Sequence, residues 1–164
     1  MRLMDMQGVL GKLQLSEAVT WNMIFVCWLI ALTGTAGSLF FSEVLNYPPC
    51  ALCWYQRIFL YPLVLVFMVE MVRKEITHLY YALPISLFGL IIAIYHNLLF
   101  YGFISKALSP CSSGVSCSEK YIEGIGFVSI PFLSAVSFFL IVIVCAVLLA
   151  GHVQRRVHQK GVEL

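Results

Sequence analysis

Two cysteines and an arginine stand close together in the stretch NYPPCALCWYQR, residues 46–57. Cys50 and Cys53 follow a double proline, and Arg57 comes four residues after the second cysteine. Pro49 suits the first position of a helix, which puts Cys50 at the second helical position and Cys53 at the fifth. The unpaired amides and the dipole of a helix start stabilise a thiolate. The pattern predicts a redox-active thiol pair with a cation about one turn deeper on the same helix face.

A second cysteine pair, Cys111 and Cys117, lies in the polar stretch SPCSSGVSCSEK. The five residues between these cysteines are small or flexible, so the segment closes easily into a disulfide loop and should be accessible. Exposed disulfides tend to be the labile, catalytic ones. Two such pairs suggest an electron relay by thiol–disulfide exchange. Cys27 and Cys145 fall inside apolar segments, and we interpret them as packing residues.

Other interpretations of these residues remain open at this point. The four cysteines of the two pairs could form a zinc site, or two structural disulfides. Arg57 could be an interfacial anchor whose long side chain reaches the membrane surface. His96 lies within an apolar segment beside Asn97. An ionisable residue there is a functional candidate, although a structural histidine fits the same position.

Long apolar segments make up most of the chain. Of its 164 residues, 61% are hydrophobic and 11% are charged, whereas soluble domains carry about 25% charged residues. A membrane-spanning helix needs about 20 mostly apolar residues. Segments 20–41, 50–72, 79–103 and 129–150 qualify. We predict an all-α membrane protein with a four-transmembrane-helix bundle at 20–150, an N-terminal cytoplasmic segment at 1–19 and a basic cytoplasmic tail at 151–164.

The basic residues predict the orientation of the bundle. Seven of the ten lysines and arginines fall on one side of the four expected spans: Arg2, Lys12, Arg73, Lys74, Arg155, Arg156 and Lys160. By the positive-inside rule this side, with both termini, is cytoplasmic. Both cysteine pairs are then extracytoplasmic, where disulfides persist. No basic stripe with interleaved aromatic residues occurs, so we expect no nucleic-acid partner.

These features together resemble a known family. PCALCWYQR at the start of a membrane helix, four spans and a second cysteine pair in the last outer loop are similar to the disulfide bond formation protein B (DsbB) family. The close spacing of Cys111 and Cys117, followed by YIEGIGFVSIPFLS, resembles the BdbC-type branch known from Gram-positive bacteria. The resemblance covers roughly residues 20–150. The two cysteines of the second pair are much closer in sequence than those of the proteobacterial type.

The resemblance implies a reaction, its partners and its location. A thioredoxin-like, DsbA-type thiol oxidase would deliver two electrons to Cys111–Cys117. The Cys50–Cys53 pair would then pass them to a membrane quinone, either ubiquinone or menaquinone. By position, Cys53 matches the family's quinone-interacting cysteine and Arg57 its quinone-site arginine. The protein would lie in the bacterial plasma (inner) membrane, with lipid around it.

His96 and the possible alternative functions remain to be considered. We include His96 among the candidate quinone-binding residues, without equating it with any histidine of the family, and we expect no metal. A vitamin K epoxide reductase-like quinone reductase is the alternative enzyme. A CxxC pair that opens the second helix, rather than a later one, argues against it. A non-catalytic membrane bundle with structural disulfides is the alternative from another class.

Overall fold

Four long helices form the described part of the protein. The computed structural model describes residues 17–74, 76–104 and 129–162, with side chains up to residue 154 in the last segment. The helices are α2 (Glu17–Leu39), α3 (Ala51–Arg73), α4 (Leu79–Phe100) and α5 (Ile130–Val162), and the π-helical turn η1 (Phe40–Val44) extends α2. Each helix contains a segment long and apolar enough to cross a membrane: Glu17–Val44, Ala51–Arg73, Leu79–Phe100 and Ile130–Gln154. The predicted all-α, four-span fold is confirmed.

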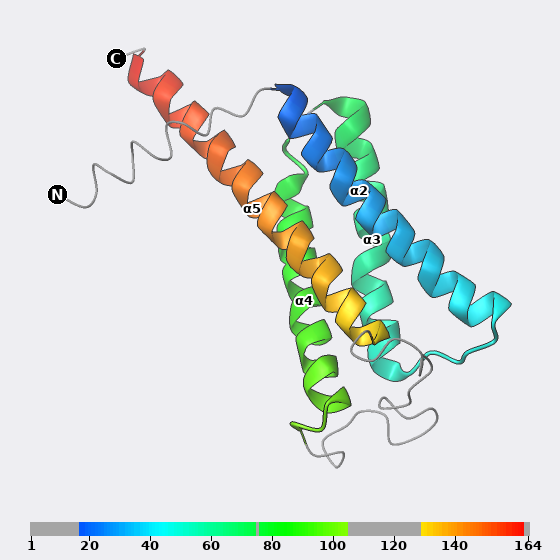
Figure 1. Cartoon of the computed structure of the whole chain (residues 1–164). Helices are drawn as coiled ribbons and strands as arrows, with labels where there is room; N and C mark the ends of the chain where they lie inside the picture. Colours follow the sequence, from blue (N-terminus) through cyan, green and yellow to red (C-terminus); the bar gives the residue numbers. More distant parts are fainter. Residues whose placement is uncertain (1–16, 75, 105–128, 163–164) are drawn as a thin grey trace.

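The helices run up and down in a closed arrangement (Figure 1). Helix α2 packs against α3 and α5, and α4 packs against the same two helices. The start of α2 and the end of α5 lie at the same end of the bundle, together with the α3–α4 connection. The starts of α3 and α5 and the end of α4 meet at the opposite end. The predicted orientation of these two ends in the membrane stays a prediction from the charges.

The ends of α4 and α5 differ from those expected. Helix α4 ends at Phe100 rather than at residue 103, because Gly102 has a φ of +80° and the N–H of Phe103 turns back to the carbonyl of Leu98 at 2.9 Å. Such a left-handed glycine is a common helix terminator. Helix α5 continues to Val162, so the part of the expected tail up to that residue prolongs the last helix.

The core lies where the helices face one another. Phe67, Phe138 and Ile141 are fully buried, and Cys27 and Cys145 lie in the same core cluster, as expected for packing residues. Gly89 of α4 faces the ring of Phe138, and a Cβ there would collide with the ring, so the glycine permits the close approach of α4 and α5. Large apolar side chains also cover the outer surface, as a bilayer requires: Ile58, Leu65, Phe88 and Phe103 are among the most exposed.

A buried acid joins α3 to the start of α4. Glu70 is fully buried, and its Oε1 lies 3.6 Å from Nδ1 of His78. A carboxylate within a spanning segment is costly unless polar groups face it. This contact therefore helps to fix the connection between the two helices, at the end of the bundle remote from Cys50 and Cys53.

Candidate active site

The first cysteine caps the helix that carries the pair. Helix α3 begins at Ala51, and Cys50 is its N-cap, with φ −70° and ψ 167°. Its Sγ accepts a hydrogen bond from the backbone N–H of Cys53 at 3.4 Å. The prediction that the helix starts at Pro49, with Cys50 at its second position, was therefore wrong. The Cys50 side chain satisfies an amide of the first turn, a role that serine or aspartate often fills.

The two cysteine sulfurs face each other at a distance of 3.0 Å, as free thiols. A disulfide needs about 2.05 Å, so small side-chain rotations would bring the two sulfurs to bonding distance when an oxidant removes their two electrons. Cys50 lies just outside the spanning segment, and its pKa is lowered from that of an ordinary thiol. The hydrogen bond with the Cys53 thiol is the main cause, and His96 and the Cys53 backbone add to it, whereas burial opposes the shift. The contacts with Cys53 and His96 thus favour a thiolate on Cys50.

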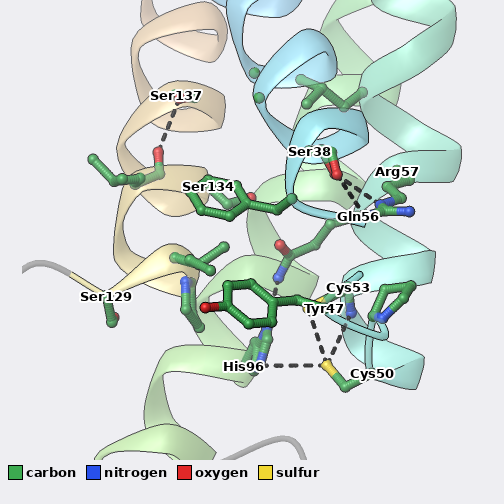
Figure 2. A pocket seen from close by; sticks show the side chains of 18 of the residues that line it. Ser38, Tyr47, Cys50, Cys53, Gln56, Arg57, His96, Ser129, Ser134 and Ser137 are labelled. Atoms are coloured by element: carbon green, nitrogen blue, oxygen red, sulfur yellow. Dashed lines mark hydrogen bonds between the residues drawn. The ribbon is translucent and has the colours of Figure 1, made fainter. Parts of the chain in front are cut away.

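A histidine from α4 and a glutamine from α3 lie beside this pair (Figure 2). Nε2 of His96 is 3.9 Å from Sγ of Cys50, and Nδ1 of the same ring is 3.0 Å from Nε2 of Gln56. His96 is only 2% exposed, and Gln56 and Cys50 are also buried. The buried contact chain therefore runs from the amide through the imidazole to the sulfur.

The arginine is anchored to α2. Nε of Arg57 donates to the hydroxyl of Ser38 at 2.7 Å, and Nη2 donates to the backbone carbonyl of Ser38 at 2.8 Å. The guanidinium carbon also lies 5.3 Å from the centre of the Trp54 ring. Arg57 is 8% exposed. An arginine that reaches the membrane surface would be exposed, so the interfacial-anchor interpretation does not describe this side chain.

These residues border one cavity of about 290 Å³, which we call the site cavity. Cys50, Cys53 and Arg57 line it, together with Gln56 and His96 (Figure 2). Its remaining wall is largely apolar and comes from α2 and η1, from the segment before α3, from α3 itself, from the end of α4 and from the start of α5. Examples are Phe41, Pro48, Leu60, Phe100, Ile130 and Leu133. Ser134 and Ser137 of α5 add hydroxyl groups on the far side. Apolar walls with a few polar groups are typical of small-molecule sites.

Three potential metal ligands also converge here. The sulfurs of Cys50 and Cys53 and a ring nitrogen of His96 all lie within 4.8 Å of one another. Thiolate and imidazole are ligands that zinc prefers. The Gln56 amide nitrogen can only donate to Nδ1 of His96, which leaves the ring proton on Nε2, the nitrogen nearest Cys50. In this tautomer Nε2 has no lone pair for a metal, so the arrangement favours thiol chemistry.

The structure brings together most of the residues predicted for the site. Cys50, Cys53, Arg57 and His96 share the site cavity, while Cys111 and Cys117 lie outside the described residues. Sequence reasoning missed two polar partners, the buried Gln56 and the half-buried Ser38. The position of Gln56 immediately before Arg57 in an apolar helix was the available signal for the first. Ser38 directly follows the small residues of Gly34–Gly37, and its own type gave no sign of a contact with Arg57.

Comparison with known proteins decides the family. The family model described as disulfide bond formation protein DsbB matches residues 19–149. The chain belongs to the DsbB family. It is 43% identical over 122 residues to the disulfide bond formation protein C of Bacillus subtilis, an alignment that covers 73% of this chain and 87% of that protein. No solved structure gives a significant match.

Other relatives carry similar names. A probable disulfide formation protein of Oceanobacillus iheyensis is 43% identical over 121 residues, which is 73% of this chain and 83% of that protein. One of Metapseudomonas resinovorans is 37% identical over 133 residues, which is 80% of this chain and 92% of the relative. The predicted resemblance to the DsbB family and its BdbC-like branch is confirmed. With its four spanning helices, the chain is a multi-pass membrane protein with a thiol oxidoreductase role in disulfide formation.

Proposed function

We propose that this protein reoxidises a thioredoxin-like, DsbA-type thiol oxidase and passes the electrons to a membrane quinone. In this proposal the electrons enter at Cys111–Cys117 and leave through Cys50–Cys53. The reaction would support disulfide bond formation in exported proteins, with the active cysteines on the extracytoplasmic side of a bacterial plasma membrane. Membership in the DsbB family favours this reaction over the vitamin K epoxide reductase-like alternative.

One observation carries the proposal: the Cys50–Cys53 pair and the buried guanidinium of Arg57 open onto the same apolar-walled cavity. Ligand pockets usually have volumes of about 300–1,000 Å³, so about 290 Å³ suits a ring of modest size. A quinone ring is flat and apolar with a carbonyl group at each end. The residues present fit such a group, because aromatic and aliphatic side chains form the walls and hydrogen-bond donors lie on two sides.

Arg57 and Ser134 are the side chains we expect to hold the two carbonyl groups. The two hydrogen bonds to Ser38 leave further N–H donors on the guanidinium. Ser134 comes from α5 and borders the cavity from the side away from Arg57. A quinone bound there would accept two electrons and two protons, the number that a dithiol releases when it becomes a disulfide.

The cysteine pair divides the reaction between two sulfurs. A thiolate of the reduced Cys111–Cys117 pair forms a bond with the sulfur of Cys50, the Cys50–Cys53 bond breaks, and the electron pair stays on Cys53. Cys53 lies in the first turn of α3, further along the helix toward Arg57, whereas Cys50 caps the helix end. This placement suits Cys50 for exchange with protein thiols and Cys53 for electron transfer into the cavity.

A turnover assay tests the proposal. The protein is purified, placed in lipid nanodiscs, and given a reduced thioredoxin-like dithiol protein with a short-chain ubiquinone or menaquinone. We expect quinone absorbance to fall with the oxidation of donor thiols, two thiols for each quinone. Cys50→Ser and Cys53→Ser should abolish this reaction. Cys27→Ala and Cys145→Ala are matched controls that should retain it, because both side chains lie in the core away from the cavity.

The loop pair has its own test in the same assay. Cys111→Ser and Cys117→Ser should stop oxidation of the protein donor. The Cys50–Cys53 pair of these variants, once reduced by a small dithiol, should still reduce quinone. Donor oxidation at the unaltered rate in both loop variants would make the loop pair a structural disulfide. A wild-type rate no higher than the uncatalysed one would favour the non-catalytic bundle.

A further inference from the structure

Gln56, His96 and Cys50 form a contact chain that electron transfer through two cysteines does not itself require. The amide nitrogen of Gln56 is 3.0 Å from Nδ1 of His96, and Nε2 of His96 is 3.9 Å from the sulfur of Cys50. The three residues are 7%, 2% and 7% exposed, respectively. Gln56 and Cys50 belong to the start of α3 and His96 to α4, so the chain crosses between two helices (Figure 2).

The chemistry of the amide determines where the ring proton lies. An amide nitrogen has two N–H donors and no acceptor. Nδ1 of His96 must therefore accept from Gln56, and the proton of the neutral ring sits on Nε2. That N–H is the ring donor nearest Cys50. A hydrogen bond from it is strongest when the sulfur is a thiolate, because charge assists the bond.

Two polar side chains close to Gln56 and His96 in the chain make hydrogen bonds to other residues. Arg57 is directed to Ser38 of α2. The side-chain nitrogen of Asn97 donates to the carbonyls of Ala93 and Pro131 at 2.8 Å each. Among the described residues, the other titratable groups near the sulfur include Cys53 on α3, Tyr95 on α4 and Tyr47 in the segment before α3. The α5 residues that border the cavity carry hydroxyl groups but no ionisable side chain.

We propose that Gln56 is a positioning residue that selects the tautomer of His96 and thereby aims an N–H donor at Cys50. The inference rests on the proposed function, in which the reduced Cys111–Cys117 dithiol passes its electrons to the Cys50–Cys53 pair through a mixed disulfide with Cys50. When the second thiolate of that dithiol attacks its partner sulfur, a new donor disulfide forms and the bond to Cys50 breaks. The electron pair then stays on Cys50, whose thiolate accepts the hydrogen bond from His96. Gln56 thus lowers the barrier to release of the re-formed Cys111–Cys117 disulfide from Cys50.

Substitutions of Gln56 can distinguish a side chain that orients His96 from one that only fills space in the core. Gln56→Met keeps the length of the side chain and removes its donors, so the ring loses its fixed tautomer. Gln56→Glu offers an acceptor in place of the donor. A carboxylate favours the doubly protonated ring, which still presents an N–H to Cys50. A residue that only fills space should tolerate methionine better than a buried carboxylate.

The test measures the reactivity of Cys50 directly. The parent protein carries Cys53→Ser, Cys27→Ala, Cys145→Ala, Cys111→Ser and Cys117→Ser, so Cys50 is its only thiol. Its alkylation by iodoacetamide is followed across the pH range in nanodiscs. At about pH 6 we expect Gln56→Met to react at least about tenfold more slowly than the parent, because a charge-assisted hydrogen bond to the thiolate is lost. Gln56→Glu should stay within about threefold of the parent.

Gln154→Met is the matched control, since this glutamine is exposed on α5 far from the cavity and should leave the profile unchanged. An unchanged profile in Gln56→Met, or an equal loss in Gln56→Met and Gln56→Glu, would overturn the proposal. If Gln56→Met does not fold, the profile of Gln56→Glu decides: a loss of tenfold or more overturns the proposal. The assay contains neither quinone nor partner, so its failure is distinct from failure of the proposed function.

Discussion

Arg57 of α3 is joined to Ser38 of α2 by two hydrogen bonds, one from Nε to the hydroxyl at 2.7 Å and one from Nη2 to the backbone carbonyl at 2.8 Å. The planar guanidinium donates to both oxygens at once, which an ammonium group cannot do in the same geometry. The pair fixes the cation at the wall of the site cavity and holds α2 against α3. Arg57 therefore has both a structural contact and free donors beside the thiol pair.

The first prediction separates quinone use from thiol exchange. Arg57→Ala should lower the rate of quinone reduction about ten- to a hundredfold, the effect of losing a hydrogen bond from a charged donor. Exchange between Cys50–Cys53 and a small dithiol should change little. Arg57→Lys should restore only part of the rate. Stopped-flow measurements of the two half-reactions provide the comparison.

Controls for this prediction come from the same helix pair. Arg73→Ala removes an exposed arginine at the other end of α3 and should leave both half-reactions unchanged. Ser38→Ala should cost less than Arg57→Ala, because the carbonyl of residue 38 still accepts from Nη2. Normal quinone kinetics in folded Arg57→Ala would leave this residue only the role of joining α2 and α3.

The second prediction concerns the pH dependence of Cys50. Its pKa is lowered, chiefly by the hydrogen bond with Cys53, so the thiolate should persist below the ordinary thiol range near about 8.5 and disappear only when the pH falls through the lowered value. Alkylation of the reduced protein, followed by mass spectrometry, should therefore continue at acidic pH. Cys53→Ala should move the midpoint upward. A cysteine placed at exposed Glu43 serves as the ordinary reference thiol, and a midpoint for Cys50 equal to that of the reference would contradict the prediction.

The sequence predicted which residues share the site better than it predicted their contacts. Cys50, Cys53 and Arg57 lie within eight residues on one helix start, so local spacing suffices to place them together. Gln56 meets a residue 40 positions away, and Arg57 meets one 19 positions away. Such pairings depend on how α2, α3 and α4 pack, and an uncharged glutamine or serine gives little warning of them.

The sequence also predicted the existence of the helices better than the residues at which they begin. Four apolar segments predicted the four spans, because a bilayer demands length and apolarity whatever the packing. The start of α3 was placed two residues early, because Pro49 can occupy either a first helical position or an extended segment. The side chain of Cys50 decides between them by capping the helix at its own position.

The third prediction tests the orientation that the basic residues imply. Glu43 and Thr77 are exposed and lie at opposite ends of the bundle, one at the end of α2 and the other between α3 and α4. In a protein without its native cysteines, a membrane-impermeant maleimide added to intact cells should label Glu43→Cys and spare Thr77→Cys. Both should react once the cells are opened. The reverse pattern would put Cys50 and Cys53 on the cytoplasmic side and remove the oxidising-compartment argument.

The last prediction concerns the size of the site cavity. Gly37 of α2 lines this cavity, and a Cβ built there meets nothing within 4 Å. Gly37→Leu should therefore fill part of the space without displacing the core. We expect the KM for quinone to rise at least about tenfold, because a ring excluded from the cavity loses contacts with several wall side chains. Thiol exchange with a small dithiol and the thermal midpoint should stay near those of the parent. Gly37→Ala adds only the Cβ and should be nearly silent, which makes it the size control. An unchanged KM in a folded Gly37→Leu variant would mean that quinone reaches the cysteine pair from outside this cavity.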